Sequence, residues 1–203
     1  MILHIVVLLL LYIIICQSQS IATIPYALYD SYVWTSTSAI YMKANIYVTS
    51  YASLNFIICS SSPTANLENE FGFFVVDTSG NNNFIPGGVG RLAVYNGKRT
   101  VTLGIYYSSG TVPLNTTVTV TASRTAAGVW SMTIAGQSQT VTKATMPVYP
   151  TEVFGNVNIP VYVGADWTQY KQFSGYVSNV VLSGGTSTGP SPTVGISILL
   201  KLS

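Results

Sequence analysis

VTVTASRTAAGVWSMTIAGQSQTVT, residues Val118–Thr142, contains three runs of alternating apolar and polar residues separated by two short Ala-Gly turns. This alternation is typical of β-strands that bury one face, and turns of this length connect antiparallel neighbours. Trp130 alternates with Met132 and Ile134 in the middle run, so we expect its ring in the core and not in a binding site. The stretch therefore predicts a three-stranded antiparallel meander.

Short strand-like runs continue on both sides of this meander. Residues 38–48 (SAIYMKANIYV) place five apolar side chains on one face of a strand and Tyr41, Lys43, Asn45 and Tyr47 on the other. Further runs rich in Val, Ile, Tyr, Phe and Thr are expected as strands at residues 54–59, 71–76, 92–95, 101–107, 161–163, 176–182 and 194–200. Clusters of Gly, Pro, Asn and Ser separate the runs, and no segment combines helical periodicity with helix caps. The pattern predicts an all-β, jelly-roll-like, two-sheet antiparallel sandwich.

Three motifs follow one another in the C-terminal half of the chain. They occupy residues 120–136 (VTASRTAAGVWSMTIAG), 161–164 (VYVG) and 173–180 (FSGYVSNV). Their order resembles that of the concanavalin A-like lectin/glucanase superfamily, and most closely its laminin G-like branch. The resemblance implies that Gly175 lets the late strand bend and approach its neighbour, while apolar residues around it fill the space between two sheets. Such sandwiches serve as glycan binders, hydrolases, adhesion modules and coat proteins, so the resemblance implies a fold and leaves the function open.

The composition is apolar and poor in charge. Of the 203 residues, 48% are hydrophobic and 7% are charged, against roughly 25% charged residues in ordinary soluble domains. The net charge of +2 comes from scattered cations without a basic stripe, so we expect no nucleic acid as a partner. The polar surface must come from Ser, Thr, Asn, Gln and Tyr, whose side chains stay uncharged in acid. This composition suits a protein exposed to acid or heat outside a cell. A general bias in the amino-acid composition of the source genome would give the same pattern.

The first twenty residues favour export. Residues 5–16 (IVVLLLLYIIIC) are apolar but fewer than the roughly 20 residues of a membrane span. Small residues follow at signal-peptidase spacing, so we expect a signal peptide in residues 1–20, cleaved after Ser18 or Ser20. The alternative is a retained anchor, because no positive segment precedes the apolar run, and only then would a membrane be a partner. We expect a secreted protein, or one on the surface of a cell or a virion.

The concanavalin A-like sandwich is expected to occupy residues 21–185. Residues 186–203 combine a spacer rich in Ser, Thr, Gly and Pro with an apolar strand at residues 194–200. That strand is too short to span a membrane, so we expect it to pair with a sheet. It either closes its own sandwich or joins the sheet of a neighbouring copy, which would produce self-association.

Few residues are candidates for catalysis. A retaining glycosidase needs two carboxylates about 5 Å apart, and only Glu68 and Glu70 lie close together in the sequence. Asn69 stands between them where the glucanases that the chain resembles carry an aspartate, and the second interval differs from theirs. His4 belongs to the expected signal peptide, so the mature chain has no histidine for a triad or a zinc site. We therefore expect that the protein is not an enzyme.

We also expect no cofactor. Calcium is the one candidate metal, because Asp77, Asn81 and Asn82 could supply oxygen ligands, but a turn explains this cluster of Asn and Gly better. Cys59 lies in the apolar run LNFIICS and is expected to be an inert thiol in the core.

Two surface sites are candidates for binding or modification. The loop at residues 165–172 (ADWTQYKQ) offers an aromatic face for a sugar ring with hydrogen-bonding groups beside it. The candidate glycan-binding residues in this loop are Asp166, Trp167, Gln169 and Tyr170. The alternative is that Trp167 folds back onto the sandwich as a lid. The second site is Asn115, which forms an acceptor for N-glycosylation with Thr116 and Thr117.

Three classes of function are compatible with these features. The first is a secreted, non-enzymatic module that recognises a glycan or a surface protein, supported by the export signal, the lectin-like resemblance and the many Tyr and Trp residues. The second is a structural subunit of a cell-surface layer, filament or virion of a thermoacidophilic archaeon or its virus, because a surface with little charge suits close packing between copies. The third is a glycoside hydrolase, which ranks last because the acid pair does not match.

Overall fold

Strands are the only regular structure in the residues that the computed structural model describes, which are 26–29, 31–52, 55–61, 69–78, 85, 87–96, 104–144, 160–164 and 173–188. The strands are β1 (Tyr26–Tyr29), β2 (Ser31–Val33), β3 (Ile40–Val48), β4 (Asn55–Ser61), β5 (Asn69–Val75), β6 (Arg91–Asn96), β7 (Gly104–Thr111), β8 (Thr117–Arg124), β9 (Trp130–Ile134), β10 (Gln137–Gln139), β11 (Val141–Lys143), β12 (Val161–Val163), β13 (Gly175–Ser183) and β14 (Thr186–Thr188). Accordingly, this part of the chain contains no helix that could cross a membrane.

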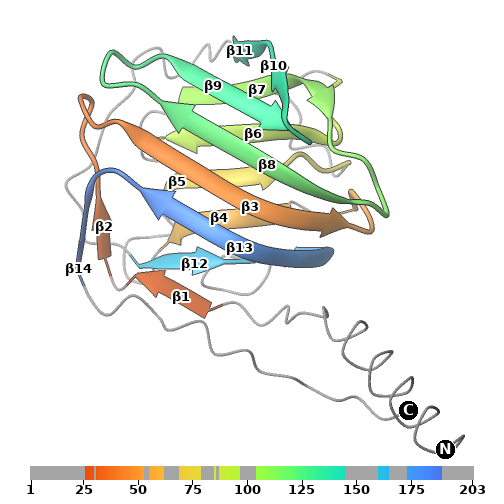
Figure 1. Ribbon diagram of the computed structural model, residues 1–203, viewed down its shortest axis with the longest axis horizontal. Coiled ribbons are helices and arrows are strands. Elements are labelled where there is room, and N and C mark those ends of the chain that lie inside the picture. The colour runs from red at the N-terminus through yellow and green to blue at the C-terminus, as the bar shows by residue number, and fades with distance from the viewer. Residues whose placement is uncertain are drawn as a thin grey trace, which may run out of the picture.

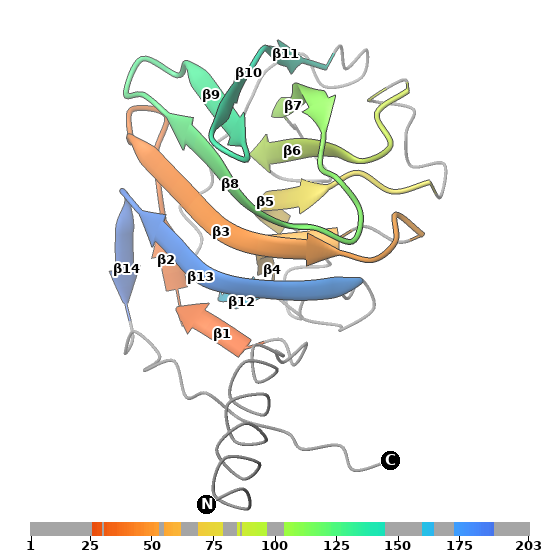
Figure 2. The same cartoon turned by 45° about the vertical axis from the view of Figure 1, so that its right-hand side comes forward.

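Two antiparallel sheets pack face to face (Figure 1). One has seven strands in the order β1-β12-β4-β5-β6-β7-β11, and the other has five in the order β10-β9-β8-β3-β13. A separate two-stranded sheet joins β14 to β2. Figure 2 shows that β3, β8 and β13 bend along their length around the core. The two-sheet antiparallel sandwich predicted from the sequence is confirmed.

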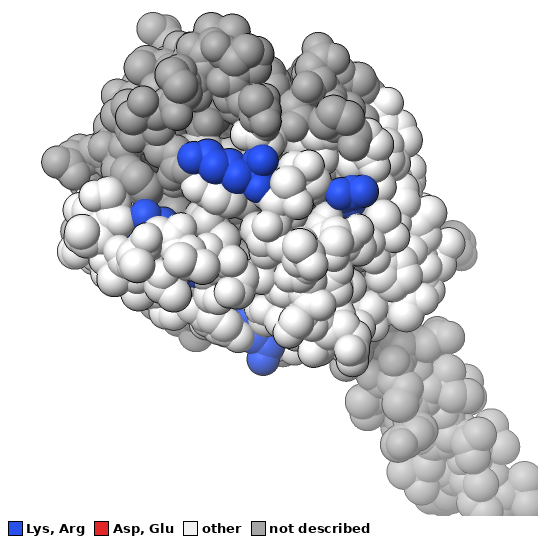
Figure 3. All heavy atoms as spheres, turned by 90° about the horizontal axis from the view of Figure 1, so that it is seen from above, with Lys and Arg blue, Asp and Glu red and all other residues white. Residues whose placement is uncertain are grey.

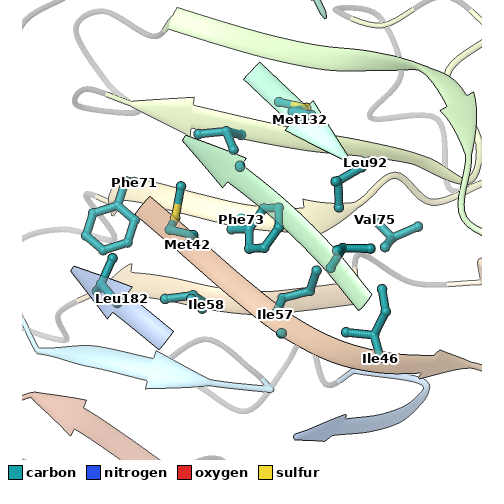
Figure 4. Packing of buried hydrophobic residues seen from close by; sticks show 14 of the residues in the cluster. Met42, Ile46, Ile57, Ile58, Phe71, Phe73, Val75, Leu92, Met132 and Leu182 are labelled. Carbon is teal, nitrogen blue, oxygen red and sulfur yellow. The ribbon is translucent and has the colours of Figure 1, made fainter. Parts of the chain in front are cut away.

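The core between the sheets is built from the alternating faces of the strands. On β3 every second residue from Ile40 to Val48 is buried, while the residues between them are exposed or half-buried. Figure 4 shows side chains of β3 in one cluster with Phe73 of β5 and Met132 of β9. Burying one large apolar side chain contributes roughly 1.5–3 kcal/mol to folding. Trp130 also lies in this core, with 6% of its surface exposed, as predicted.

The seven-stranded sheet is buried on its other face as well. Phe56, Cys59, Phe74 and Tyr95 belong to a second apolar cluster there. Gly72 makes room for it, because a Cβ atom at this position would lie 2.4 Å from a ring carbon of Tyr95. Burial on both faces explains why these strands read as continuous apolar runs. The predicted burial of Cys59 is confirmed, since none of its surface is exposed.

The late strand β13 pairs with β3 along most of its length. It begins at Gly175, whose φ of 137° favours glycine and where an added Cβ atom would collide with the carbonyl oxygen of Tyr47, so the close approach implied by the resemblance is confirmed. A bulge after Ser178, where Asn179 has a φ of 50°, interrupts the pairing. The alternation shifts at this bulge, so Val181 turns outward with 42% of its surface exposed while Leu182 turns into the core.

Two predicted strand assignments are wrong in part. The third run of the predicted meander, residues 137–142, is not one strand, because it divides at Thr140 into β10 and β11, which lie in different sheets. The amide of Ser109 donates to the carbonyl of Thr140 at 2.8 Å, and the amide of Thr140 donates to Ser109 Oγ at 3.2 Å. These bonds hold the chain where it crosses between the sheets. The run predicted at residues 101–107 continues as β7 to Thr111, because its later residues also pair with β6 and β11.

Three short strands are absent from the sequence prediction. These are β1, β2 and β14, which have four, three and three residues and are too short to show a period of two. The strand β14 lies within the expected spacer, yet it pairs with β2 in register. The hydroxyl of Tyr32 on β2 donates to the carbonyl of Gly184 just before β14. Pairing with a distant segment, and not local propensity, makes these residues strands.

Arg124 on β8 holds the segment between β2 and β3. Only 6% of its surface is exposed, and its guanidinium donates to the carbonyls of Ser36 at 2.7 Å and Ser38 at 2.9 Å. The same guanidinium lies 5.9 Å from the centroid of the Trp34 ring. That ring meets Trp130 edge to face with centroids 6.0 Å apart. Arg124 therefore fixes the start of β3 and the aromatic side chains behind it.

Candidate functional site

The outer face of the five-stranded sheet is covered by hydroxyl-bearing side chains. Since alternate residues of β3, β8 and β9 point into the core, the residues between them point outward. We call these outward residues the hydroxyl face; they are Tyr41, Lys43, Asn45, Tyr47, Thr117, Thr119, Thr121, Ser123, Ser131, Thr133, Ser138, Tyr176, Ser178, Val181 and Ser183. All of them are exposed or half-buried.

Strand register arranges this face in rows that run across the sheet. One row joins Tyr176, Tyr47 and Thr117, and the row at the other end contains Tyr41 beside Ser123. Tyr41 and Tyr47 are six residues apart on β3, which corresponds to about 20 Å at the usual rise of a strand. The rows between these ends carry Asn45, Lys43 and several threonines. The face thus has aromatic rings at both ends and hydrogen-bonding groups between them.

Side-chain contacts order the middle of the face. Thr119 Oγ1 donates to Asn45 Oδ1 at 2.8 Å, and the Oγ1 atoms of Thr121 and Thr133 share a hydrogen bond of 2.7 Å. Because Asn45 accepts through its oxygen, its Nδ2 hydrogens stay available, and no described residue accepts them. These bonds restrict the rotamers, so a ligand would lose less side-chain entropy on binding.

Two tyrosines stack at one end of the face. The rings of Tyr47 and Tyr176 have centroids 5.5 Å apart and planes inclined by 36°. Tyr176 keeps 43% of its surface exposed, and Tyr41 at the opposite end keeps 39%. Exposed rings of this kind present flat apolar surfaces next to polar groups.

Charge on the described surface is sparse and positive. Lys43 is the one charged residue of the hydroxyl face. Among the described side chains the sole carboxylate is that of Asp77, which is buried with 2% of its surface exposed. Figure 3 views the molecule from above and shows separate Lys and Arg patches without any Asp or Glu in colour. This part of the surface therefore suits ligands that are rich in hydroxyl groups and carry little or no positive charge.

The loop predicted to bind glycans lies outside the described residues, together with its candidates Asp166, Trp167, Gln169 and Tyr170. The same holds for the expected signal peptide and for the apolar strand near the C-terminus.

The predicted acid pair and calcium ligands are described only in part. Glu70 belongs to β5 by its backbone, while Glu68, Asn81 and Asn82 lie outside the described residues. Asp77 is buried and is not a surface ligand. No group of three or more His, Cys, Asp or Glu that could hold a metal ion occurs among the described residues.

The hydroxyl face itself was not predicted as a site. The polar positions of β3 are visible in the sequence, because Tyr41, Lys43, Asn45 and Tyr47 alternate with apolar residues. Their neighbours on β8 and β13 come from segments far away in the chain. The rows appear only when the register of all three strands is known.

No family model and no curated protein sequence matches the chain. Among solved structures, it is similar to domains LG4-5 of the mouse laminin α1 chain, with 17% identity, a TM-score of 0.45, and coverage of 78% of this chain and 41% of that chain. It is also similar to a sialidase of Trypanosoma rangeli, with 13% identity, a TM-score of 0.41, and coverage of 71% of this chain and 20% of that chain. A third similar structure is the polysaccharide lyase family 18 protein aly-SJ02, with 14% identity, a TM-score of 0.40, and coverage of 75% and 74% of the two chains. The chain thus spans less than half of the laminin and sialidase chains.

Proposed function

We propose that this chain is an extracellular, non-enzymatic recognition module and that its hydroxyl face binds neutral glycans. The observation that supports this most directly is the spacing of aromatic rings at both ends of a face lined with hydroxyl and amide groups. The low charge of the face fits ligands whose polar groups are hydroxyls.

The chemistry of such a contact follows from the side chains. A pyranose ring has an apolar C–H surface that packs on an aromatic ring, and Tyr41 and Tyr176 are exposed enough to accept one. The sugar hydroxyls between these points can donate to threonine oxygens and accept from Asn45 Nδ2. Because the face is open, we expect weak binding to a single sugar and tighter binding to a chain long enough to reach both ends.

The test is a screen of neutral and acidic oligosaccharides with the exported chain, followed by titration of the variants Tyr41→Ser and Tyr176→Ser. Each loss of one stacking partner is expected to weaken binding roughly 3- to 10-fold. Val129→Ser is the matched control, because Val129 is 60% exposed and lies outside the hydroxyl face. Unchanged affinity in both tyrosine variants would refute this site.

A structural subunit of a surface layer, filament or virion is the second candidate. Among the described residues β13 pairs with β3 on one side only, and Tyr176 and Val181 on it are exposed. An edge strand with apolar side chains is a surface on which another copy can add. Light scattering of the exported chain tests this: assemblies that Val181→Lys dissolves and Val129→Lys leaves intact would favour the structural role.

A further inference from the structure

Asn115 lies in an exposed turn between β7 and β8. Its backbone has a φ of 54°, in the left-handed region that asparagine adopts more readily than most residues. Asn115, Thr116 and Thr117 are all exposed. The backbone amide of Asn115 donates to the carbonyl of Val48 at 2.8 Å, which fixes the turn against the end of β3. No described residue hydrogen-bonds the side-chain carboxamide, so its nitrogen is accessible to a reagent.

The third residue of the acceptor sequence belongs to the tyrosine row of the hydroxyl face. Thr117 is the cross-strand partner of Tyr47, and Tyr47 is the partner of Tyr176. Neighbouring strands lie about 4.8 Å apart, so the backbones of Tyr47 and Tyr176 lie about 5 and 10 Å from that of Thr117 across the sheet. Asn115 lies two residues before Thr117 and is bonded to Val48, the residue after Tyr47, so a group attached to it starts at the end of the face that carries these two rings.

We propose that Asn115 is N-glycosylated and that the first sugars of its glycan pack on Tyr47 and Tyr176, covering that end of the hydroxyl face. The modification requires export, which the first twenty residues favour. It does not require that the face bind free glycans. On the glycosylated protein only the Tyr41 end would be open to a free glycan, so titrations with free glycans are made after the Asn115 glycan has been removed. Tyr41 lies at the opposite end of β3 and would stay uncovered.

The attachment step needs a glycan donor in which the sugar is linked to a lipid pyrophosphate. The Asn115 amide nitrogen attacks the anomeric carbon of the first sugar and forms a C–N bond. The bond between that carbon and the pyrophosphate oxygen breaks, and the lipid pyrophosphate leaves with the electron pair. The amide nitrogen loses one proton, so the step involves no oxidation or reduction.

A role confined to the turn is the competing explanation for Asn115, and substitutions separate the two. Asn115→Asp keeps a side chain of the same shape that tolerates the left-handed region, but it cannot carry the glycan. Thr117→Ser keeps the acceptor sequence, whereas Thr117→Ala removes it at the same position.

The first measurement is the intact mass of the full exported chain, from its own source or from a secretory host with an oligosaccharyl transferase. We expect a glycan mass in the wild type and in Thr117→Ser, and none in Asn115→Asp or Thr117→Ala. Enzymatic release of the glycan should convert Asn115 to aspartate, which peptide mass mapping locates. An exported chain without added mass overturns the proposal, whether or not the face binds free sugars.

The second measurement tests the packing on the tyrosines. Removing the glycan from the folded wild type should lower its melting temperature by about 2–4 °C. The same removal from the double variant Tyr47→Ser/Tyr176→Ser should leave the melting temperature unchanged. An equal drop in both proteins would show that the glycan does not rest on these rings and would overturn that half of the proposal.

Discussion

The backbone of Gly175 lies directly against the carbonyl oxygen of Tyr47, so that a Cβ atom on Gly175 would stand 1.8 Å from that oxygen. Gly175 is the first residue of β13, and the next residue, Tyr176, is the cross-strand partner of Tyr47 on β3. Any side chain at Gly175 would force the two strands apart at this point, because a backbone oxygen cannot turn away as a flexible side chain can.

Gly175→Ala is therefore expected to destabilise the protein by about 3–5 kcal/mol, because it combines a backbone clash with a φ of 137°. This corresponds to a drop of roughly 10 °C in the melting temperature. Gly136→Ala is the control, since Gly136 also has a positive φ but nothing lies within 4 Å of its added Cβ. It should cost about 1 kcal/mol, and equal losses for both variants in chemical denaturation would contradict the close contact.

Replacing Arg124 tests the hydrogen bonds that hold the segment between β2 and β3. Arg124→Met keeps the apolar part of the side chain but leaves the carbonyls of Ser36 and Ser38 without their donor. We expect a loss of about 3 kcal/mol in the free energy of unfolding. Arg124→Lys should be intermediate, because an ammonium group keeps the charge but cannot donate to both carbonyls in the same fork geometry. A Met variant as stable as the wild type would show that these hydrogen bonds contribute nothing to stability.

Much of the fold could be predicted because the strands of the meander and of residues 38–48 alternate clearly between apolar and polar residues. Gly175 could be assigned a role because the family pattern contains it. The crossing at Thr140 could not be predicted, since a turn within a sheet and a crossing between sheets have the same local composition. The bulge at Asn179 decides on which face of the sheet Val181 lies. The sequence does not reveal this bulge, because the run of apolar residues around Val181 does not alternate.

The candidate site was less predictable than the fold. Sequence reasoning favoured the loop around Trp167, because a loop brings its own aromatic and polar residues together within a few positions. The hydroxyl face depends on three strands whose register is set by tertiary structure. Asn115 was predictable as an acceptor sequence, while its place beside Val48 at the end of β3 was not.

The loop at residues 165–172 remains a second proposed contact for glycans. If Trp167 stacks on a sugar while Asp166 and Gln169 bond its hydroxyls, Trp167→Ala should abolish that binding and barely change the melting temperature. Titration calorimetry and thermal unfolding of the same sample provide the two measurements. A drop of several degrees with binding retained would instead assign Trp167 to a lid on the sandwich.

Replacing Glu68 and Glu70 by Gln should change no function of the protein. We expect the wild type to release no sugar from β-glucans, because the spacing of this pair does not match that of the glucanases in the superfamily that the motifs resemble. Reducing-sugar assays on the exported wild type and on the double variant provide the check. Turnover by the wild type that disappears in the variant would establish the hydrolase alternative.

Alkaline pH should destabilise the protein through its buried phenols. Burial raises the pKa of Tyr32 above its usual value, with a further contribution from Tyr29, and burial also raises the pKa of Tyr51. The folded state thus keeps these groups neutral to a higher pH than the unfolded state does. Their stabilisation is complete below about pH 10, the usual pKa of tyrosine, and is lost as the pH rises further.

The measurement is the melting temperature between pH 7 and 12. Each melting temperature is expressed relative to that of the same protein at pH 7, where Tyr32→Phe starts lower than the wild type. On this scale Tyr32→Phe should lose less stability than the wild type over the alkaline part of the range. Tyr41→Phe, which alters an exposed phenol, should follow the wild type. Parallel alkaline curves for all three proteins would exclude the buried phenols as the cause.

The pairing of β3 with β13 also has a consequence for the order of events during synthesis. Thr49, just after β3, donates to the carbonyl of Ser174, just before β13, across 125 residues of chain. Such non-local pairing slows folding, because a long loop must close before the contact contributes any stability. The five-stranded sheet cannot be completed until the last quarter of the chain has emerged. If the chain is exported, as we propose, the late completion of this sheet would keep it in the unfolded state that passage through a secretion channel requires.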